Sequence, residues 1–126
     1  MKSKYKMCLL IDDSSLDNFI NSKIIKMSNF AKEIVVSEHA EDALAMLRDG
    51  KVEPDIIFLD IKMPVMDGFQ FLEEYDKIDI DKKHTKIFIL TTSLNPADIE
   101  RAKHNKYVTK FVSKNLTPAV LLELAS

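Results

Sequence analysis

The amino-acid sequence predicts an α/β fold in which a parallel sheet of five strands is covered by helices on both faces. Short apolar runs alternate along the chain with longer stretches whose apolar residues have helical spacing. The runs are continuous over most of their length, which is typical of parallel strands buried on both faces. Right-handed crossovers through five helices would join these strands into one sheet. The predicted strands comprise residues 7–11, 34–36, 56–59, 87–90 and 107–112.

Apolar stripes and end-capping residues mark the predicted helices. Three stripes are expected to face the sheet: Leu16, Ile20, Ile24 and Met27; Ala40, Ala43, Leu44 and Leu47; and Phe71, Leu72, Tyr75 and Ile78. Helix starts are indicated by Asn95-Pro96, by Thr117-Pro118 and by a capping box from Asp67 to Gln70, and Gly50 is suited to a helix end. The fourth helix has few apolar residues, so we expect it to be the least firmly held.

Length and composition predict a single soluble domain over residues 1–126. The formal net charge is −2, with acidic and basic residues nearly balanced, so nucleic acid and membrane are not expected as partners. The apolar run after the basic N-terminus is too short for a signal peptide. Cys8 is the only cysteine, and it is predicted to be a buried hydrophobe in a reducing compartment. We therefore expect a cytoplasmic location.

Acidic and hydroxyl side chains follow three of the predicted strands. Asp12 and Asp13 follow the first, Asp60 follows the third, and Thr91, Thr92 and Ser93 follow the fourth. Because the carboxyl ends of parallel strands share one edge of the sheet, these side chains are expected to converge there. Three carboxylates around one point, with room for water, predict a Mg²⁺ site. The alternative is that each acid only caps the helix that follows it.

Four motifs together give the chain a family resemblance. They are "DDS" after the first strand, "FLDIKMPVMDG" around the third, "LTTS" after the fourth and "FVSKN" at the fifth. In this order and at these spacings, the chain resembles the stand-alone receiver domains of two-component response regulators. The resemblance implies a flavodoxin-like sheet of strand order 2-1-3-4-5. It also implies a signalling domain that catalyses only its own phosphorylation and dephosphorylation.

The resemblance assigns roles to individual residues. Asp60 is implied to be the phosphoacceptor, while Thr92 and Lys114 are implied to bind the phosphoryl oxygens. The implied magnesium ligands are Asp12, Asp13, Asp60 and the backbone carbonyl of Lys62. Thr92 and Phe111 are implied to act as the switch, with Phe111 expected to stay mostly inward because it has no polar tip.

The implied partners are a sensor histidine kinase or a histidine phosphotransfer protein, and an unidentified downstream protein. Phosphorylation is implied to change binding through the fourth helix, the fifth strand and the fifth helix. The alternative is a degenerate receiver that binds proteins without phosphorylation. A dehalogenase-type phosphatase site at Asp79-Ile80-Asp81 is disfavoured because no apolar strand precedes it.

Two local features leave room for different structures. The family normally has proline after the lysine of the fifth strand, whereas Asn115 follows Lys114 here. A cis peptide costs about 2.5–4 kcal/mol before a residue other than proline, so we expect a trans bond. The Lys62 side chain either reaches the acidic cluster as a stand-in cation or stays in solvent.

Overall fold

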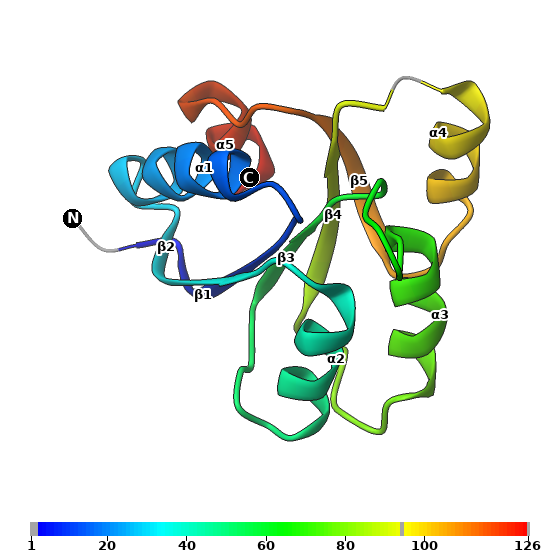
Figure 1. Ribbon diagram of the computed structural model, residues 1–126. Helices are drawn as coiled ribbons and strands as arrows, with labels where there is room; N and C mark the ends of the chain where they lie inside the picture. Colours follow the sequence, from blue (N-terminus) through cyan, green and yellow to red (C-terminus); the bar gives the residue numbers. More distant parts are fainter. Residues whose placement is uncertain (1–2, 94, 126) are drawn as a thin grey trace.

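A parallel five-stranded sheet forms the centre of the protein, in the order β2-β1-β3-β4-β5, as predicted. A computed structural model describes residues 3–93 and 95–125. Figure 1 shows the twisted sheet running between two groups of helices. The strands are β1 (Tyr5–Ile11), β2 (Ala31–Ser37), β3 (Ile56–Leu59), β4 (Lys86–Thr91) and β5 (Val108–Ser113).

Five helices cover the two faces of the sheet, and each face has its own core. One core packs beneath α1 and α5, with Cys8 among its buried members. The other lies beneath α2, α3 and α4 on the opposite face (Figure 1). The helices are α1 (Ser15–Met27), α2 (Ala40–Arg48), α3 (Gly68–Lys77), α4 (Pro96–Lys103) and α5 (Pro118–Leu124).

The predicted helix ends are confirmed by their hydrogen bonds. The side chains of Asn95 and Thr117 accept hydrogen bonds from the first turns of α4 and α5. Asp67 and Gln70 form both bonds of a capping box at the start of α3. Gly50 follows α2 with a φ of 72°, a left-handed conformation that glycine adopts without steric cost.

The orientation of α1 confirms the predicted stripe only in part, because Ile24 packs against the core whereas the two ends of the stripe do not. Its buried residues are Asn18, Asn21 and Ile25. Leu16 and Met27, which were expected to face the sheet, are 65% and 75% exposed. The inward face of α1 is polar because it must satisfy backbone groups: Asn18 Nδ2 donates to the carbonyl of Asp12, and Asn21 Oδ1 accepts from the N–H of Leu116.

The peptide between Lys114 and Asn115 is cis, so the predicted trans bond is wrong. That prediction rested on the local preference of an isolated peptide. In the folded protein, contacts on both sides hold this loop. Lys114 N–H donates to the Thr91 carbonyl at 3.0 Å, and Leu116 N–H donates to Asn21 Oδ1 at 3.1 Å.

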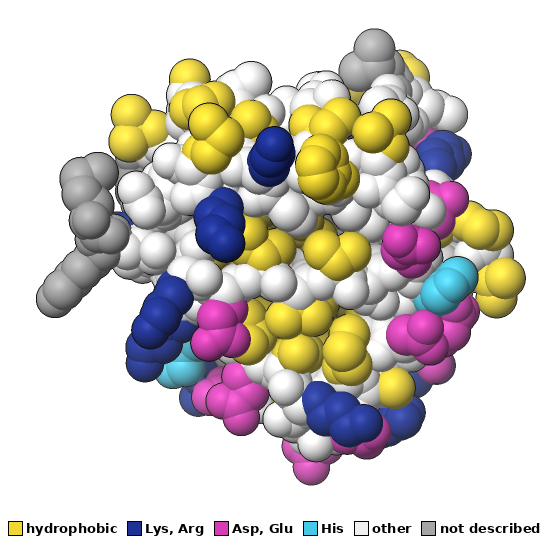
Figure 2. Space-filling model, turned by 60° about the vertical axis from the view of Figure 1, so that its left-hand side comes forward, with side chains coloured by type: hydrophobic (Ala, Val, Ile, Leu, Met, Phe, Trp, Pro, Cys, Tyr) yellow, Lys and Arg dark blue, Asp and Glu magenta, His cyan; other side chains and the backbone are white. Residues whose placement is uncertain are grey.

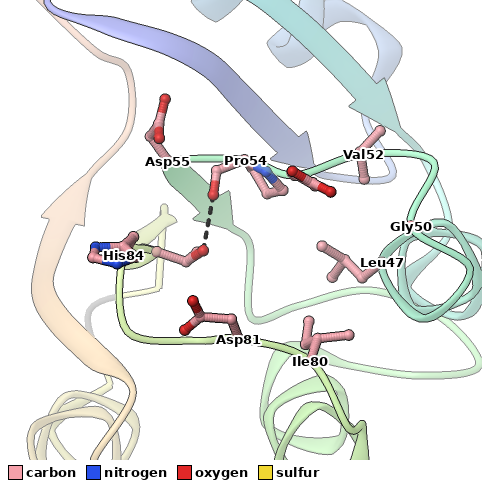
Figure 3. A pocket seen from close by; sticks show the side chains of 10 residues that line it. Leu47, Gly50, Val52, Pro54, Asp55, Ile80, Asp81 and His84 are labelled. Atoms are coloured by element: carbon pink, nitrogen blue, oxygen red, sulfur yellow. Dashed lines mark hydrogen bonds between the residues drawn. The ribbon is translucent and has the colours of Figure 1, made fainter.

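One hollow at the amino ends of β3 and β4 is not associated with the predicted site. It has a volume of about 400 Å³ and lies between the segments that precede β3 and β4. The Thr85 hydroxyl donates a 2.8 Å hydrogen bond to the Pro54 carbonyl, and a dashed line marks this bond at Pro54 in Figure 3. Asp12 and Asp60 lie at the other end of the sheet. Among the described residues, no helix is long and apolar enough to cross a membrane.

Candidate functional site

The register of the sheet brings the first and third strand ends together. Ile11 of β1 pairs with Leu59 of β3, so the next residues, Asp12 and Asp60, are neighbours. The backbone continues this ladder, because Asp60 N–H donates to the Ile11 carbonyl at 2.9 Å. The convergence of residues nearly fifty positions apart therefore follows from strand pairing.

Three carboxylates gather at this edge. Asp12, Asp13 and Asp60 each offer an oxygen within 4.8 Å of the others. Asp12 and Asp60 are buried, whereas Asp13 is exposed. Asp12 Oδ1 accepts from Ser14 N–H at 2.9 Å, and Asp60 Oδ1 accepts from Lys62 N–H at 3.4 Å. Clustered hard oxygen donors with one open side fit a divalent cation such as Mg²⁺ or Mn²⁺.

Lys114 brings a positive charge into this cluster from β5. Thr91 pairs with Ser113, and the next residue, Lys114, extends from the strand end. Its Nζ lies 2.6 Å from Asp12 Oδ2 and 3.3 Å from Asp60 Oδ2. The Lys114 side chain is only 5% exposed, so these contacts are largely shielded from water.

The buried charges shift two pKa values. Burial raises the pKa of Asp12 above its ordinary value, and the charge of Asp60 adds to the rise, against hydrogen bonds from Lys114 and Ser14. Burial alone would lower the pKa of Lys114, but hydrogen bonds to Asp12 and Asp17 and the charge of Asp60 raise it. These contacts thus stabilise the charged form of the Lys114 ammonium, whereas burial destabilises the charged form of Asp12.

Asp17 also contacts this lysine, although the sequence did not predict it as a site residue. Asp17 Oδ2 lies 2.9 Å from Lys114 Nζ. An acid in the first turn of a helix ordinarily interacts with the helix dipole. The sequence position of Asp17 therefore gave no reason to assign it a second role. The signal was the helical spacing of Asp17, Asn18 and Asn21, which places three polar residues near one face of α1.

The remaining predicted residues differ in their burial. Thr92 follows the last residue of β4 and is exposed, while Thr91 is buried and accepts from Ser93 N–H through its Oγ1. Phe111 is partly buried against the core beneath α2, α3 and α4, in agreement with an inward side chain.

The Lys62 side chain takes up neither of its two predicted positions fully. It is 65% exposed, yet its Nζ pairs with Asp98 Oδ2 of α4 at 3.2 Å and does not occupy the acidic cluster. Asp98 lies in the first turn of α4, whereas Asp12 and Asp60 already pair with Lys114.

Fold and site together define a receiver domain. Residues 8–126 match the family described as the response regulator receiver domain, and the chain belongs to that family. Its class is therefore a signalling domain of two-component systems.

Known proteins similar to this chain include the response regulator Rcp1 of Synechocystis sp. It is 33% identical over 119 residues, which cover 88% of this chain and 79% of Rcp1. A structure of the Mn²⁺-bound form of Rcp1 matches with a TM-score of 0.76 at 25% identity, over 95% of this chain and 88% of that one. A two-component response regulator from Cytophaga hutchinsonii matches with a TM-score of 0.87 at 30% identity, over 98% and 95% of the two chains.

A larger relative is the sensor histidine kinase CheAY of Helicobacter pylori, which is 32% identical over 105 residues. These residues cover 81% of this chain but only 13% of CheAY. The similarity is thus to one part of a much longer protein.

Proposed function

We propose that this protein is a phosphoacceptor that receives a phosphoryl group on Asp60. The observation that carries the proposal is the convergence of Asp12, Asp13 and Asp60 with the buried ammonium of Lys114 at one edge of the sheet. In the proposed reaction, a carboxylate oxygen of Asp60 attacks the phosphorus of a phosphohistidine. A P–O bond forms, the P–N bond breaks, and its electron pair stays on the imidazole, which can then take up a proton.

Each neighbour has a part in this transfer. Lys114 and the hydroxyl of Thr92 would bind oxygens of the phosphoryl group and so balance the charge that develops on them. Asp12, Asp13, Asp60 and the carbonyl of Lys62 would hold Mg²⁺. The bound cation would supply charge neutralisation. The Mn²⁺-bound form of the relative Rcp1 supports a divalent cation in this role.

Phosphorylation by a small donor tests this proposal directly. The protein is incubated with acetyl phosphate and Mg²⁺, and intact-mass analysis detects the added phosphoryl group. We expect Asp60→Asn to abolish its incorporation and also the joint binding of beryllium fluoride and Mg²⁺. The control is Asp79→Asn, because Asp79 is exposed and lies in the alternative phosphatase motif. Incorporation into the Asp60→Asn protein at wild-type stoichiometry would refute the assignment.

The donor in the cell is proposed to be a sensor histidine kinase or a histidine phosphotransfer protein, in the cytoplasm. Supporting this, α1 presents an exposed apolar face that adjoins the site: Phe19 is 61% exposed, and Leu16 precedes the site residue Asp17. Figure 2, which views the molecule from the side of α1 and α5, shows hydrophobic side chains gathered among lysines. Such mixed surfaces are typical of protein interfaces.

A substitution on this face separates the protein donor from a small one. Phe19→Asp should slow phosphorylation by a phosphorylated histidine phosphotransfer domain but leave phosphorylation by acetyl phosphate unchanged. Equal rates for wild type and variant with the protein donor would rule out this face as the docking surface. Loss of both activities would indicate a damaged site.

We propose further that phosphorylation alters α4, β5 and α5. The attachment of α4 supports this, since Ala102 is its only buried residue. Two contacts tie its start to the site loops: Asp98 accepts from Ser93 Oγ at 2.9 Å and pairs with Lys62. Hydrogen exchange with and without beryllium fluoride and Mg²⁺ should therefore change in α4 and β5 and stay constant in Asp60→Asn. A protein that binds its target equally well in both states would instead be a degenerate receiver.

A further inference from the structure

The ammonium of Lys114 contacts two of the carboxylates that a divalent cation would need as ligands, those of Asp12 and Asp60. Its three N–H donors meet three carboxylates, those of Asp12, Asp17 and Asp60. Asp12 and Asp60 belong to the acidic cluster, whereas Asp17 does not. Asp12 and Asp60 must therefore loosen their contacts with Lys114 before they can hold a cation of higher charge.

Asp17 is built differently from the carboxylates of the cluster. It lies in the first turn of α1, where its N–H donates to Ser14 Oγ at 3.2 Å. Its side chain is 27% exposed, compared with 6% for Asp12 and 7% for Asp60. Asp17 thus contacts the lysine from the rim of the site, on a helix whose start is capped.

We propose that Asp17 is a positioning residue that retains Lys114 beside Asp60 while Asp12 is taken up by a divalent cation. The inference rests on the phosphoacceptor function proposed above and extends it to a residue outside the acidic cluster. When the cation displaces the ammonium from Asp12, the 2.9 Å contact to Asp17 persists. Lys114 then remains next to the acceptor and is not driven into solvent by cation repulsion.

Removing the Asp17 charge should weaken Mg²⁺ binding in a manner that depends on Lys114. Without Asp17, the ammonium can pair only with Asp12 and Asp60, so it competes with the cation more strongly. Mg²⁺ affinity is measured by calorimetry for the wild type, Asp17→Asn, Lys114→Met and the double variant. Glu38→Gln is the control, because it removes an exposed charge after β2 that makes no contact with Lys114 in the described structure.

We expect Asp17→Asn to weaken Mg²⁺ binding about tenfold when Lys114 is present and only about twofold in the Lys114→Met background, the coupling expected of groups in direct contact. Equal losses in both backgrounds would mean that Asp17 acts only as a distant charge, and no loss with Lys114 present would leave it without a role. Either result overturns the proposal. Wild-type protein that binds Mg²⁺ but takes no phosphate from acetyl phosphate would instead count against the phosphoacceptor function alone.

Nuclear magnetic resonance of the lysine ammonium gives a second readout if the Lys114→Met protein does not fold. In the wild type with Mg²⁺, the Nζ protons of Lys114 should remain protected from exchange with water. In Asp17→Asn with Mg²⁺, they should exchange too fast to be observed. Protection of these protons in both proteins would contradict retention by Asp17.

Discussion

Gly68, at the start of α3, lies so close to the Asp60 backbone that the position of this backbone should depend on the absence of a side chain at residue 68. A Cβ on residue 68 would lie 2.5 Å from the Asp60 carbonyl oxygen and 2.9 Å from Ile61 Cα. Ordinary contacts begin at 3.4 Å, so the shortfall to the carbonyl is about 0.9 Å. Both atoms belong to the backbone and cannot rotate away as a flexible side chain would. The N–H of residue 68 is also bonded to the Ile61 carbonyl at 2.9 Å, which keeps the two segments together.

We expect Gly68→Ala to lower the free energy of unfolding by about 3 kcal/mol, the upper end of the usual overpacking cost. At a typical urea m-value, this loss lowers the midpoint by about 2 M. Circular dichroism during urea unfolding measures it, and phosphorylation by acetyl phosphate should slow because the Asp60 backbone must move.

Gly50→Ala is the matched control for this variant. Nothing lies within 4 Å of the added Cβ, so its cost comes only from the left-handed φ of 72° and should be about 1 kcal/mol. It should leave phosphorylation unchanged. A Gly68→Ala protein as stable as Gly50→Ala would refute the steric reasoning.

The charges of the site give two further expectations, and the attachment of α4 gives a third. Lys114→Met should lower the free energy of unfolding by about 3 kcal/mol without Mg²⁺, since Asp12 and Asp60 lose their buried counter-charge, and saturating Mg²⁺ should restore most of it in urea unfolding. Asp12→Asn should raise stability by about 1 kcal/mol at neutral pH without Mg²⁺. Burial is the main reason that the pKa of Asp12 is raised in the folded protein. The free energy of unfolding should therefore fall as pH increases from 3.8 through that higher pKa. Urea unfolding over this pH range should show no such fall in Asp12→Asn. Asp98→Asn should cost only about 0.5 kcal/mol but speed amide exchange in α4; unchanged exchange would show that its contacts to Ser93 and Lys62 do not hold the helix.

The sheet could be predicted because its determinants are local. Buried parallel strands are continuous apolar runs, and the β3 run matches the strand residue for residue. The edge strand β2 extends beyond the predicted residues 34–36, and the sequence missed its ends because Lys32, Glu33 and Ser37 are polar and interrupt the apolar run. Helix ends were predictable for the same local reason, since Asn95 and Thr117 bond to their own first turns.

The candidate site was predictable where it depends on strand ends and not where it depends on side-chain contacts between elements. Asp12, Asp13 and Asp60 follow β1 and β3 directly, so the strand pairing brings them together. Asp17 and Asp98 contact Lys114 and Lys62 from helices, and their positions in the sequence do not specify these lysines as partners. The cis peptide after Lys114 was not predicted because the prediction considered only the intrinsic preference of that bond and not the contacts of the loop.

The polar residues that α1 buries are explained by the same loops that form the site. Loops at the end of a sheet leave their backbone groups without strand partners, and buried groups of this kind must still be bonded. Asn18 bonds the carbonyl of Asp12, and Asn21 bonds the N–H of Leu116 just beyond Lys114. One face of α1 thus holds the loops that supply Asp12 and Lys114, and its polar residues take positions that apolar ones would otherwise fill. Leu16 and Phe19 are therefore left on the outer face of α1, beside Asp17, where a partner protein is proposed to dock.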